Sequence, residues 1–211
     1  MVQLALEELD PASSPGIDGV PAALYQKLKD VFVSRIWDKL CRLKAASDWE
    51  DDWRTGIVRT VPKEQGAKEV AKQRPITLLN VRAKWVTLVI KKAIDDCLQV
   101  VVPAEQRGFM SKRDSDKHLH AVMHIQQQQT QGAWLALDFK KAFDSVGHGA
   151  IRAMLEYVGL DAAWVRVVMQ FLRGPMGYLV GQTVAEERIC PQRGIKQGDT
   201  LSPSIFALVT A

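Results

Sequence analysis

The stretch WLALDFKKAFDSV at positions 134–146 puts an aspartate, Asp138, at the end of a short apolar run. The run at 134–139 predicts a strand, and we expect that strand to feed a helix further along the chain. A carboxylate at the end of a strand can hold Mg²⁺ against phosphate oxygens, as phosphoryl transfer requires. An aspartate in this position can also simply cap the turn that follows. The stretch alone leaves both interpretations of Asp138 open.

Helical and strand patterns alternate on either side of this stretch. A turn-rich segment at 16–21 precedes a helical region in which Leu24, Leu28, Phe32 and Leu40 are expected to share a face. The further predicted elements are a strand at 54–61, a polar loop at 62–74, a helix at 81–100 with Val86, Val89, Ile90 and Ala93 inward, a helix at 116–130, a helix at 151–158 ended by Gly159, a helix capped by Asp161, a hairpin of 178–180 with 187–190 turning at 181–183, and a helix with Ser202 as N-cap and Pro203 as its first residue.

The composition limits the classes of protein to which this chain can belong. With 47% hydrophobic and 25% charged residues, the 211 positions can bury a core as one good-sized domain or as two small lobes. The formal charge of +4 and the pI near 9.0 suit a polyanionic partner, but the excess is too small to decide the matter. The start MVQLALEELD is acidic where a signal peptide is basic, and no apolar run approaches the ~18 residues of a membrane span. We therefore expect a soluble protein without a membrane partner.

The cysteines indicate the compartment. Cys41, Cys97 and Cys190 are odd in number, far apart and without a CxxC pair. This pattern favours reduced thiols over a disulfide framework or a zinc site. We therefore expect an intracellular protein, either cytoplasmic or nuclear.

Three histidines resemble a metal cluster at first sight. His120 and His124 lie one helical turn apart, as zinc ligands can, and His118 is close in sequence. No HExxH pattern, nearby cysteine or acidic third ligand accompanies them. We expect exposed helix residues here.

Several ordered motifs extend over nearly the whole chain. They are PGIDGV at 15–20, VPK at 61–63, RPITLLN at 74–80, QRGF at 106–109, ALDFKKAFDSV at 136–146 and RGIKQGDTLSP at 193–203. In this order and spacing, from about Ser13 to Leu208, the sequence resembles the reverse transcriptase domain of non-LTR (LINE-type) retrotransposons. The residues of the RPITLLN motif favour such an element over an intron-encoded maturase.

The resemblance implies an α/β (α+β) fold in the form of a right-hand polymerase. Residues 1–131 would be a fingers-like region and residues 132–211 a partial palm, with the thumb absent. The family's palm continues into a hairpin with an aromatic-Ala-Asp-Asp motif, but no YADD or FADD string occurs in this sequence. We therefore expect a chain truncated before that second acidic motif, with an incomplete site for two Mg²⁺ ions.

The resemblance assigns roles to residues of the central motif. Asp138 matches the family's catalytic metal ligand, and Phe139 matches the residue that offers its backbone carbonyl to a metal. Phe143 matches an aromatic gate under the incoming sugar, which would favour deoxynucleotides, but it can equally be a plain core phenylalanine. Asp144 and Asp199 are tempting additional ligands. We expect loop-fixing or capping for Asp144 and a place in a helix-entry loop for Asp199.

Nucleotide-binding residues are implied in two further motifs. Lys63 and Arg74 bracket a polar loop, and such cations can close onto a triphosphate, although a solvated surface charge is the simpler alternative. Gln197 would lie near the incoming nucleotide. Gly198 would allow close approach of the backbone to template or sugar.

The leading hypothesis is an RNA-directed DNA polymerase (reverse transcriptase) fragment of a non-LTR retrotransposon. Its partners would be an RNA template, a DNA primer and deoxynucleoside triphosphates, and its oligomeric state is open. The first alternative is a catalytically inactive retroelement relic that at most binds nucleic acid through a basic groove. The second is an Mg²⁺ phosphohydrolase with Asp138 as nucleophile, which leaves the RPITLLN and QGDTLSP segments without a purpose.

Overall fold

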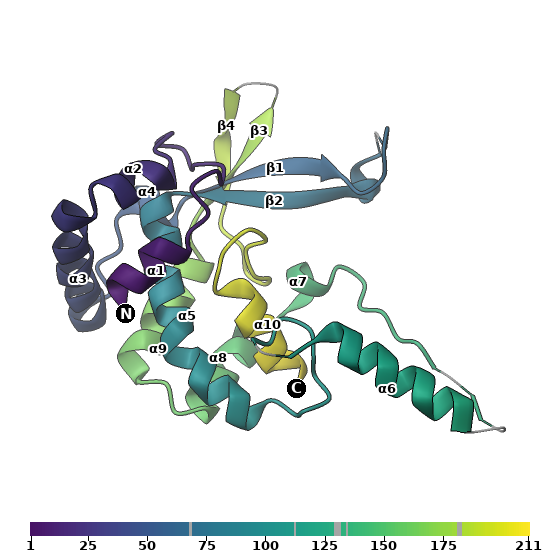
Figure 1. Ribbon diagram of the computed structural model, residues 1–211. Helices are drawn as coiled ribbons and strands as arrows, with labels where there is room; N and C mark the ends of the chain where they lie inside the picture. The colour runs from purple at the N-terminus through teal and green to yellow at the C-terminus, as the bar shows by residue number, and fades with distance from the viewer. Residues whose placement is uncertain (68, 112, 129–131, 134, 181–182) are drawn as a thin grey trace.

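The fold combines helices with one mixed sheet, as the predicted α/β (α+β) class requires (Figure 1). The computed structural model describes residues 1–211 except 68, 112, 129–131, 134, 181 and 182. The helices are α1 Val2–Glu8, α2 Ala22–Lys27, α3 Lys29–Ala46, α4 Asp51–Arg54, the 3₁₀ turn η1 Val70–Lys72, α5 Val81–Val101, α6 Ser115–Gln128, α7 Ala142–Ser145, α8 His148–Tyr157, α9 Ala162–Leu172 and α10 Ser202–Thr210. The strands are β1 Gly56–Pro62, β2 Gln73–Leu79, β3 Met176–Val180 and β4 Thr183–Ile189.

The sheet brings together strands that are far apart in sequence. Its order is β2-β1-β3-β4. β1 pairs antiparallel with β2, from Gly56 opposite Leu79 to Pro62 opposite Gln73, and β3 pairs antiparallel with β4. β1 also runs parallel to β3 at its first residues, where Gly56 lies opposite Met176. The sheet thus joins strands from both sides of the predicted boundary between residues 131 and 132, which itself stays a prediction.

α5 is the central helix of the core. The Asn80 side chain caps its first turn by accepting a hydrogen bond from the Arg82 N–H at 3.1 Å. Trp85 is completely buried, and its indole Nε1 donates to the Val2 carbonyl at 2.8 Å, which ties α1 to α5. Around α5, buried residues of α1, α3, α8, α9 and α10 form one continuous apolar cluster.

Several predicted elements are confirmed. The helix expected at 81–100 is α5, and the helix expected at 116–130 corresponds to α6, with residues 129 and 130 outside the described ones. The expected hairpin is β3 with β4, but its pairing differs from the prediction, because Val180 lies opposite Thr183 and Gly177 lies opposite Arg188. Residues 181 and 182 of its turn lie outside the described residues.

Asp161 caps α9 by accepting a hydrogen bond from the Ala163 N–H at 2.7 Å. α10 begins one residue earlier than predicted, because Leu201 is its N-cap and Ser202 is already helical.

The strand predicted at 134–139 is wrong for the residues that the structure describes there. Residues 135–139 form no strand, while Trp134 lies outside the described residues. Leu135, Leu137 and Phe139 are 82%, 83% and 67% exposed. A strand is stabilised by hydrogen bonds to a neighbouring strand, and none of the described strands lies beside this segment.

The predicted inward faces need two corrections. Leu24 and Leu28 are 43% and 44% exposed, because the chain leaves helical geometry at Leu28, between α2 and α3. A face that is continuous in the sequence pattern is therefore broken in space. Ala93 is exposed, while Val86 and Ile90 are buried as predicted. Among the described helices, none is long and apolar enough to span a membrane.

The core makes one direct prediction. Leu155 on α8 is completely buried, so Leu155→Ala should lower the free energy of unfolding by about 3 kcal/mol. Leu119 on α6 is 57% exposed, so Leu119→Ala should change it by less than about 0.5 kcal/mol. Urea titration followed by circular dichroism measures both values. Equal losses in the two variants would contradict this assignment of the core.

Candidate functional site

Two sequence motifs about fifty residues apart meet through their backbones. The Gly194 N–H donates to the Val146 carbonyl at 2.7 Å, and the Ile195 N–H donates to the Phe143 carbonyl at 3.0 Å. Gly147 and Arg193 form an isolated β-bridge beside them. The segment AFDSV therefore lies directly against RGIKQGD.

This contact requires glycine at position 194. Its φ is +88°, and a Cβ there would lie 3.1 Å from the Asp144 Cα. The Gly194 carbonyl accepts a hydrogen bond from Nε2 of the buried His148, at 3.0 Å. Burial lowers the pKa of His148, and its buried Nδ1 has no hydrogen-bond partner among the described residues. The neutral imidazole with its proton on Nε2 fits this arrangement.

The loop then docks on the edge strand of the sheet. The Thr77 N–H of β2 donates to the Gln197 carbonyl at 2.6 Å. Gly198 has φ +107°, and a Cβ there would lie 2.6 Å from the Thr77 carbonyl oxygen. Gly198 does allow a close backbone approach, and in this structure its partner is β2. The predicted contact of Gly198 with template or sugar stays a prediction.

Lys196 crosses the interior behind Gln197. Its side chain is 3% exposed, its Nζ donates to the Arg54 carbonyl at 2.7 Å, and the ammonium lies 4.5 Å from the ring centroid of Phe171. Burial lowers the pKa of Lys196 to about 8, while the nearby carboxylate of Asp199 opposes that shift.

Asp199 anchors the start of α10. Its carboxylate accepts a hydrogen bond from the Thr87 hydroxyl at 2.6 Å and another from the Leu201 N–H at 3.1 Å. Burial raises the pKa of Asp199, and the hydrogen bond from Thr87 opposes that shift. The predicted place of Asp199 in a helix-entry loop is confirmed.

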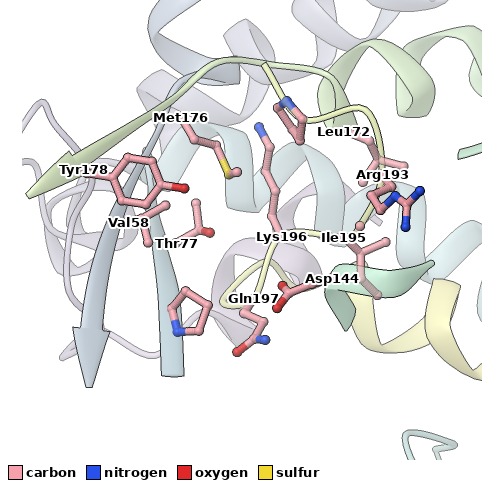
Figure 2. A pocket seen from close by; sticks show the side chains of 13 residues that line it. Val58, Thr77, Asp144, Leu172, Met176, Tyr178, Arg193, Ile195, Lys196 and Gln197 are labelled. Atoms are coloured by element: carbon pink, nitrogen blue, oxygen red, sulfur yellow. The ribbon is translucent and has the colours of Figure 1, made fainter. Parts of the chain in front are cut away.

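These contacts enclose a cavity of about 230 Å³ (Figure 2). β1, β2 and β3 supply one part of its lining, and α7 and the loop supply another. In Figure 2, Tyr178 and Met176 lie on one side, Asp144 and Gln197 lie below, and the Lys196 side chain runs between them. Its lining combines apolar side chains with an amide, a carboxylate, a phenol and two cationic side chains, those of Lys196 and Arg193.

Phe143 belongs to an aromatic cluster. Its ring centroid lies 5.0 Å from that of Phe206 on α10 and 5.7 Å from that of Phe109 in the QRGF motif. The ring is partly buried. Phe143 thus packs as a core phenylalanine, and the predicted role as a gate under the sugar stays a prediction.

The predicted triphosphate cations lie outside the cavity. Arg74 is exposed and lies opposite Val61, whereas Thr77, which lines the cavity, lies opposite Val58. Because side chains alternate along a strand, Arg74 and Thr77 project from opposite faces of the sheet. Lys63 is exposed beyond the end of β1, and its N–H donates to the Lys72 carbonyl at 2.9 Å. The structure therefore brings neither cation next to Gln197.

The acidic residues do not assemble into a metal centre. Asp138 is exposed in the irregular segment, Asp144 lines the cavity, and Asp199 is buried and hydrogen-bonded within the loop. Among the described residues, no group of three His, Cys, Asp or Glu side chains could hold a metal ion. The described carboxylates therefore do not fit a site for two Mg²⁺ ions.

The predictions for the histidines and cysteines agree with the structure. His118, His120 and His124 are exposed on α6, as predicted for helix residues. The three cysteines are free and exposed. Sequence reasoning missed His148 and Lys196, and Tyr178 was placed in a hairpin without a role. Their buried or cavity-lining positions depend on distant segments, so no local pattern distinguished them.

The geometry of the loop predicts opposite effects for two glycines. Gly198→Ala should lower the free energy of unfolding by about 2 kcal/mol or more, because its φ is positive and Thr77 leaves no space. Gly149 on α8 has nothing within 4 Å of an added Cβ, so Gly149→Ala should leave stability unchanged or raise it. Thermal unfolding measures both. A harmless Gly198→Ala would contradict the docking of the loop on β2.

The buried lysine predicts a specific pH dependence. Because the folded pKa of Lys196, about 8, lies below the usual lysine value, the unfolded chain binds more protons above pH 8. The contribution of Lys196 to stability should therefore rise by about 2 kcal/mol between pH 8 and pH 10. The free energy of unfolding of the wild type relative to Lys196→Met, measured at both pH values, isolates this rise. A constant difference would contradict it.

Comparison with known proteins adds sequence relationships to this geometry. The family described as "Reverse transcriptase (RNA-dependent DNA polymerase)" matches residues 61–211. The chain is 27% identical over 202 residues to the "Retrovirus-related Pol polyprotein from type-2 retrotransposable element R2DM" of Drosophila melanogaster, covering 94% of this chain and 19% of that protein. It is 28% identical over 218 residues to the "Retrovirus-related Pol polyprotein from type-1 retrotransposable element R2" of Popillia japonica, covering 99% of this chain and 29% of that protein. The chain thus spans less than a third of either relative.

Proposed function

Since the chain belongs to the reverse transcriptase family, we propose that it is a nucleotide- and template-contacting part of an RNA-directed DNA polymerase. The R2 polyproteins place it with the non-LTR retrotransposons. In this proposal residues 1–131 act as fingers and residues 132–211 as part of the palm. The partners are an RNA template, a DNA primer and deoxynucleoside triphosphates.

The observation that carries the proposal is the joining of two motifs around one cavity. Segment 142–147 and loop 193–199 are held together by the hydrogen bonds from Gly194 and Ile195. The same loop is fixed to β2 through Thr77. Polymerisation needs parts of the chain that are distant in sequence to contact one nucleotide, and a preorganised cavity meets that need.

Gln197, Gly198 and Phe143 are the proposed nucleotide contacts of this part. Gln197 lines the cavity and is only partly exposed, so its amide can donate to or accept from a sugar or base. Phe143 packs in a cluster of three rings with Phe109 and Phe206, which also contact each other. A fixed ring is what discrimination against a 2′-hydroxyl by steric exclusion requires.

Lys63 and Arg74 are proposed as phosphate contacts of the ribbon formed by β1 and β2. Both side chains are exposed and project into solvent. Their positions outside the cavity mean that a triphosphate would reach them at the ribbon, away from Gln197. Arg74 offers the planar donor fork that suits phosphate oxygens, whereas Lys63 supplies a point charge.

Asp138 is proposed as a metal-binding catalytic carboxylate, with the Phe139 carbonyl as a second ligand atom. Reverse transcriptases as a family use Mg²⁺, but the described carboxylates do not fit that site. Asp138 needs further carboxylates before it can serve in catalysis. The proposed activity therefore concerns a polymerase that contains more acidic residues than this arrangement brings together.

A second candidate function is nucleic-acid binding without catalysis. It is favoured by the exposed, irregular segment that carries Asp138 and by the lack of an assembled metal site in the described residues. The net charge of +4 suits such binding. This protein would be a retroelement relic.

Primer extension on an RNA template with Mg²⁺ and deoxynucleotides separates the two functions. Four proteins are compared: this chain, this chain with Asp138→Asn, a version lengthened by an aromatic-Ala-Asp-Asp hairpin, and the lengthened version with Asp138→Asn. We expect extension by the lengthened version alone, with a loss of at least about 100-fold in the variant, because a metal ligand is removed. Asp96→Asn is the matched control, since Asp96 is exposed on α5.

Each other outcome is decisive. Extension by the chain as it stands, abolished by Asp138→Asn, would mean that Asp144 or Asp199 completes the metal site after all. Silence of all proteins, together with salt-dependent binding of the primer–template in fluorescence anisotropy, would favour the non-catalytic function.

A further inference from the structure

We propose that Lys196 is a positioning residue that holds Gln197 at the cavity by fastening the loop to the carbonyl of Arg54. The role of Gln197 as a nucleotide contact rests on the proposed function, but the fastening itself does not. Lys196 lines the same cavity, and the role assigned to it here is positioning, not catalysis. It acts on the residue that follows it in the chain.

The first support is the environment of the ammonium. Nζ donates to the Arg54 carbonyl at 2.7 Å and lies over the Phe171 ring. A Cβ at Gly174 would lie 2.5 Å from that carbonyl oxygen and 3.0 Å from Nζ. Because Gly174 has no side chain, there is room for the Lys196 ammonium to reach the Arg54 carbonyl.

The second support is where this anchor lies in the fold. Arg54 ends α4 two residues before the start of β1, and Gly174 follows α9 two residues before the start of β3. β1 and β3 begin as parallel neighbours there, and the Gly56 N–H donates to the Pro175 carbonyl at 3.0 Å. Lys196 is thus fastened beside the first residues of the two central strands of the sheet.

The third support is the order of contacts along the loop. Lys196 binds the last residue of α4, just before β1, through its side chain, and the next residue, Gln197, binds the middle of β2 through its carbonyl. Two consecutive residues are therefore fixed to two different points of one sheet. Loss of the first bond should loosen the second, because Lys196 and Gln197 are adjacent in the chain and a shift of the Lys196 backbone moves the Gln197 carbonyl with it.

The Thr77 amide reports directly on the seating of Gln197. Its N–H points away from β1 and donates to the Gln197 carbonyl, whereas the neighbouring amides of Ile76 and Leu78 point toward β1. Hydrogen exchange by NMR distinguishes these amides. A purely structural role for Lys196 would alter the exchange of all three in proportion to global stability.

The experiment compares Lys196→Met with Lys39→Met. Methionine keeps the length of the side chain and removes the donor. Lys39 is also 3% exposed, but its Nζ lies 3.4 Å from Asp48 and Glu50 and over the Trp53 ring, so it contacts the α4 region through side chains and has no hydrogen bond to the Arg54 carbonyl. We expect exchange at Thr77 to accelerate at least about tenfold in Lys196→Met, relative to Ile76 and Leu78, and to keep its wild-type ratio to them in Lys39→Met.

Two results would overturn the proposal: an unchanged ratio of Thr77 to its neighbours, or the same change in Lys39→Met. If Lys196→Met does not fold, Phe171→Leu provides a second test, because it removes the ring beneath the ammonium and keeps an apolar side chain at this buried position beside Trp49. A smaller acceleration confined to Thr77 is expected there, and an unchanged ratio would count equally against the proposal. Neither measurement depends on polymerase activity, so a silent primer-extension assay leaves this test intact.

Discussion

The hydrogen bond from the Thr77 N–H to the Gln197 carbonyl, at 2.6 Å, is the contact on which the candidate site depends. β2 is an edge strand, so its outward N–H groups have no partner within the sheet. The loop satisfies one of them and covers part of the edge. Once the loop is fixed there, its other residues have to reach the core, α7 and the root of the sheet from that position.

This close docking requires glycine at two positions of the loop. Gly198 lets the loop backbone approach β2, and Gly194 lets it approach the backbone of Asp144. Both have positive φ, so two functions of glycine, space and backbone freedom, are used at the same positions. The approach on both sides leaves the cavity between the loop and the sheet, and it places Gln197 and Asp144 at that cavity.

Local signals predicted much of the fold, and long-range contacts explain what they missed. The Asp161 cap and the apolar pattern of α5 are properties of neighbouring residues, so the sequence could reveal them. The segment 135–139 has a strand-like pattern, but a strand also needs a partner that the pattern does not supply. Likewise, the motif identified Arg74, whereas its face of the sheet depends on the register of β1 with β2.

The buried charges near the loop are better explained by specificity than by stability. Lys196, Asp199 and Lys84 are all buried. Burial lowers the pKa of the two lysines and raises the pKa of Asp199, so in each case it favours the neutral form. Removing such charged groups from water costs free energy. Well-packed apolar residues in their place often stabilise a fold as much as the buried charges do. What they add is selectivity: the Arg54 carbonyl and the Thr87 hydroxyl satisfy them in one arrangement. A loop displaced from β2 would leave a charge buried without its partner, so the same groups that weaken the core exclude alternative positions of Gln197.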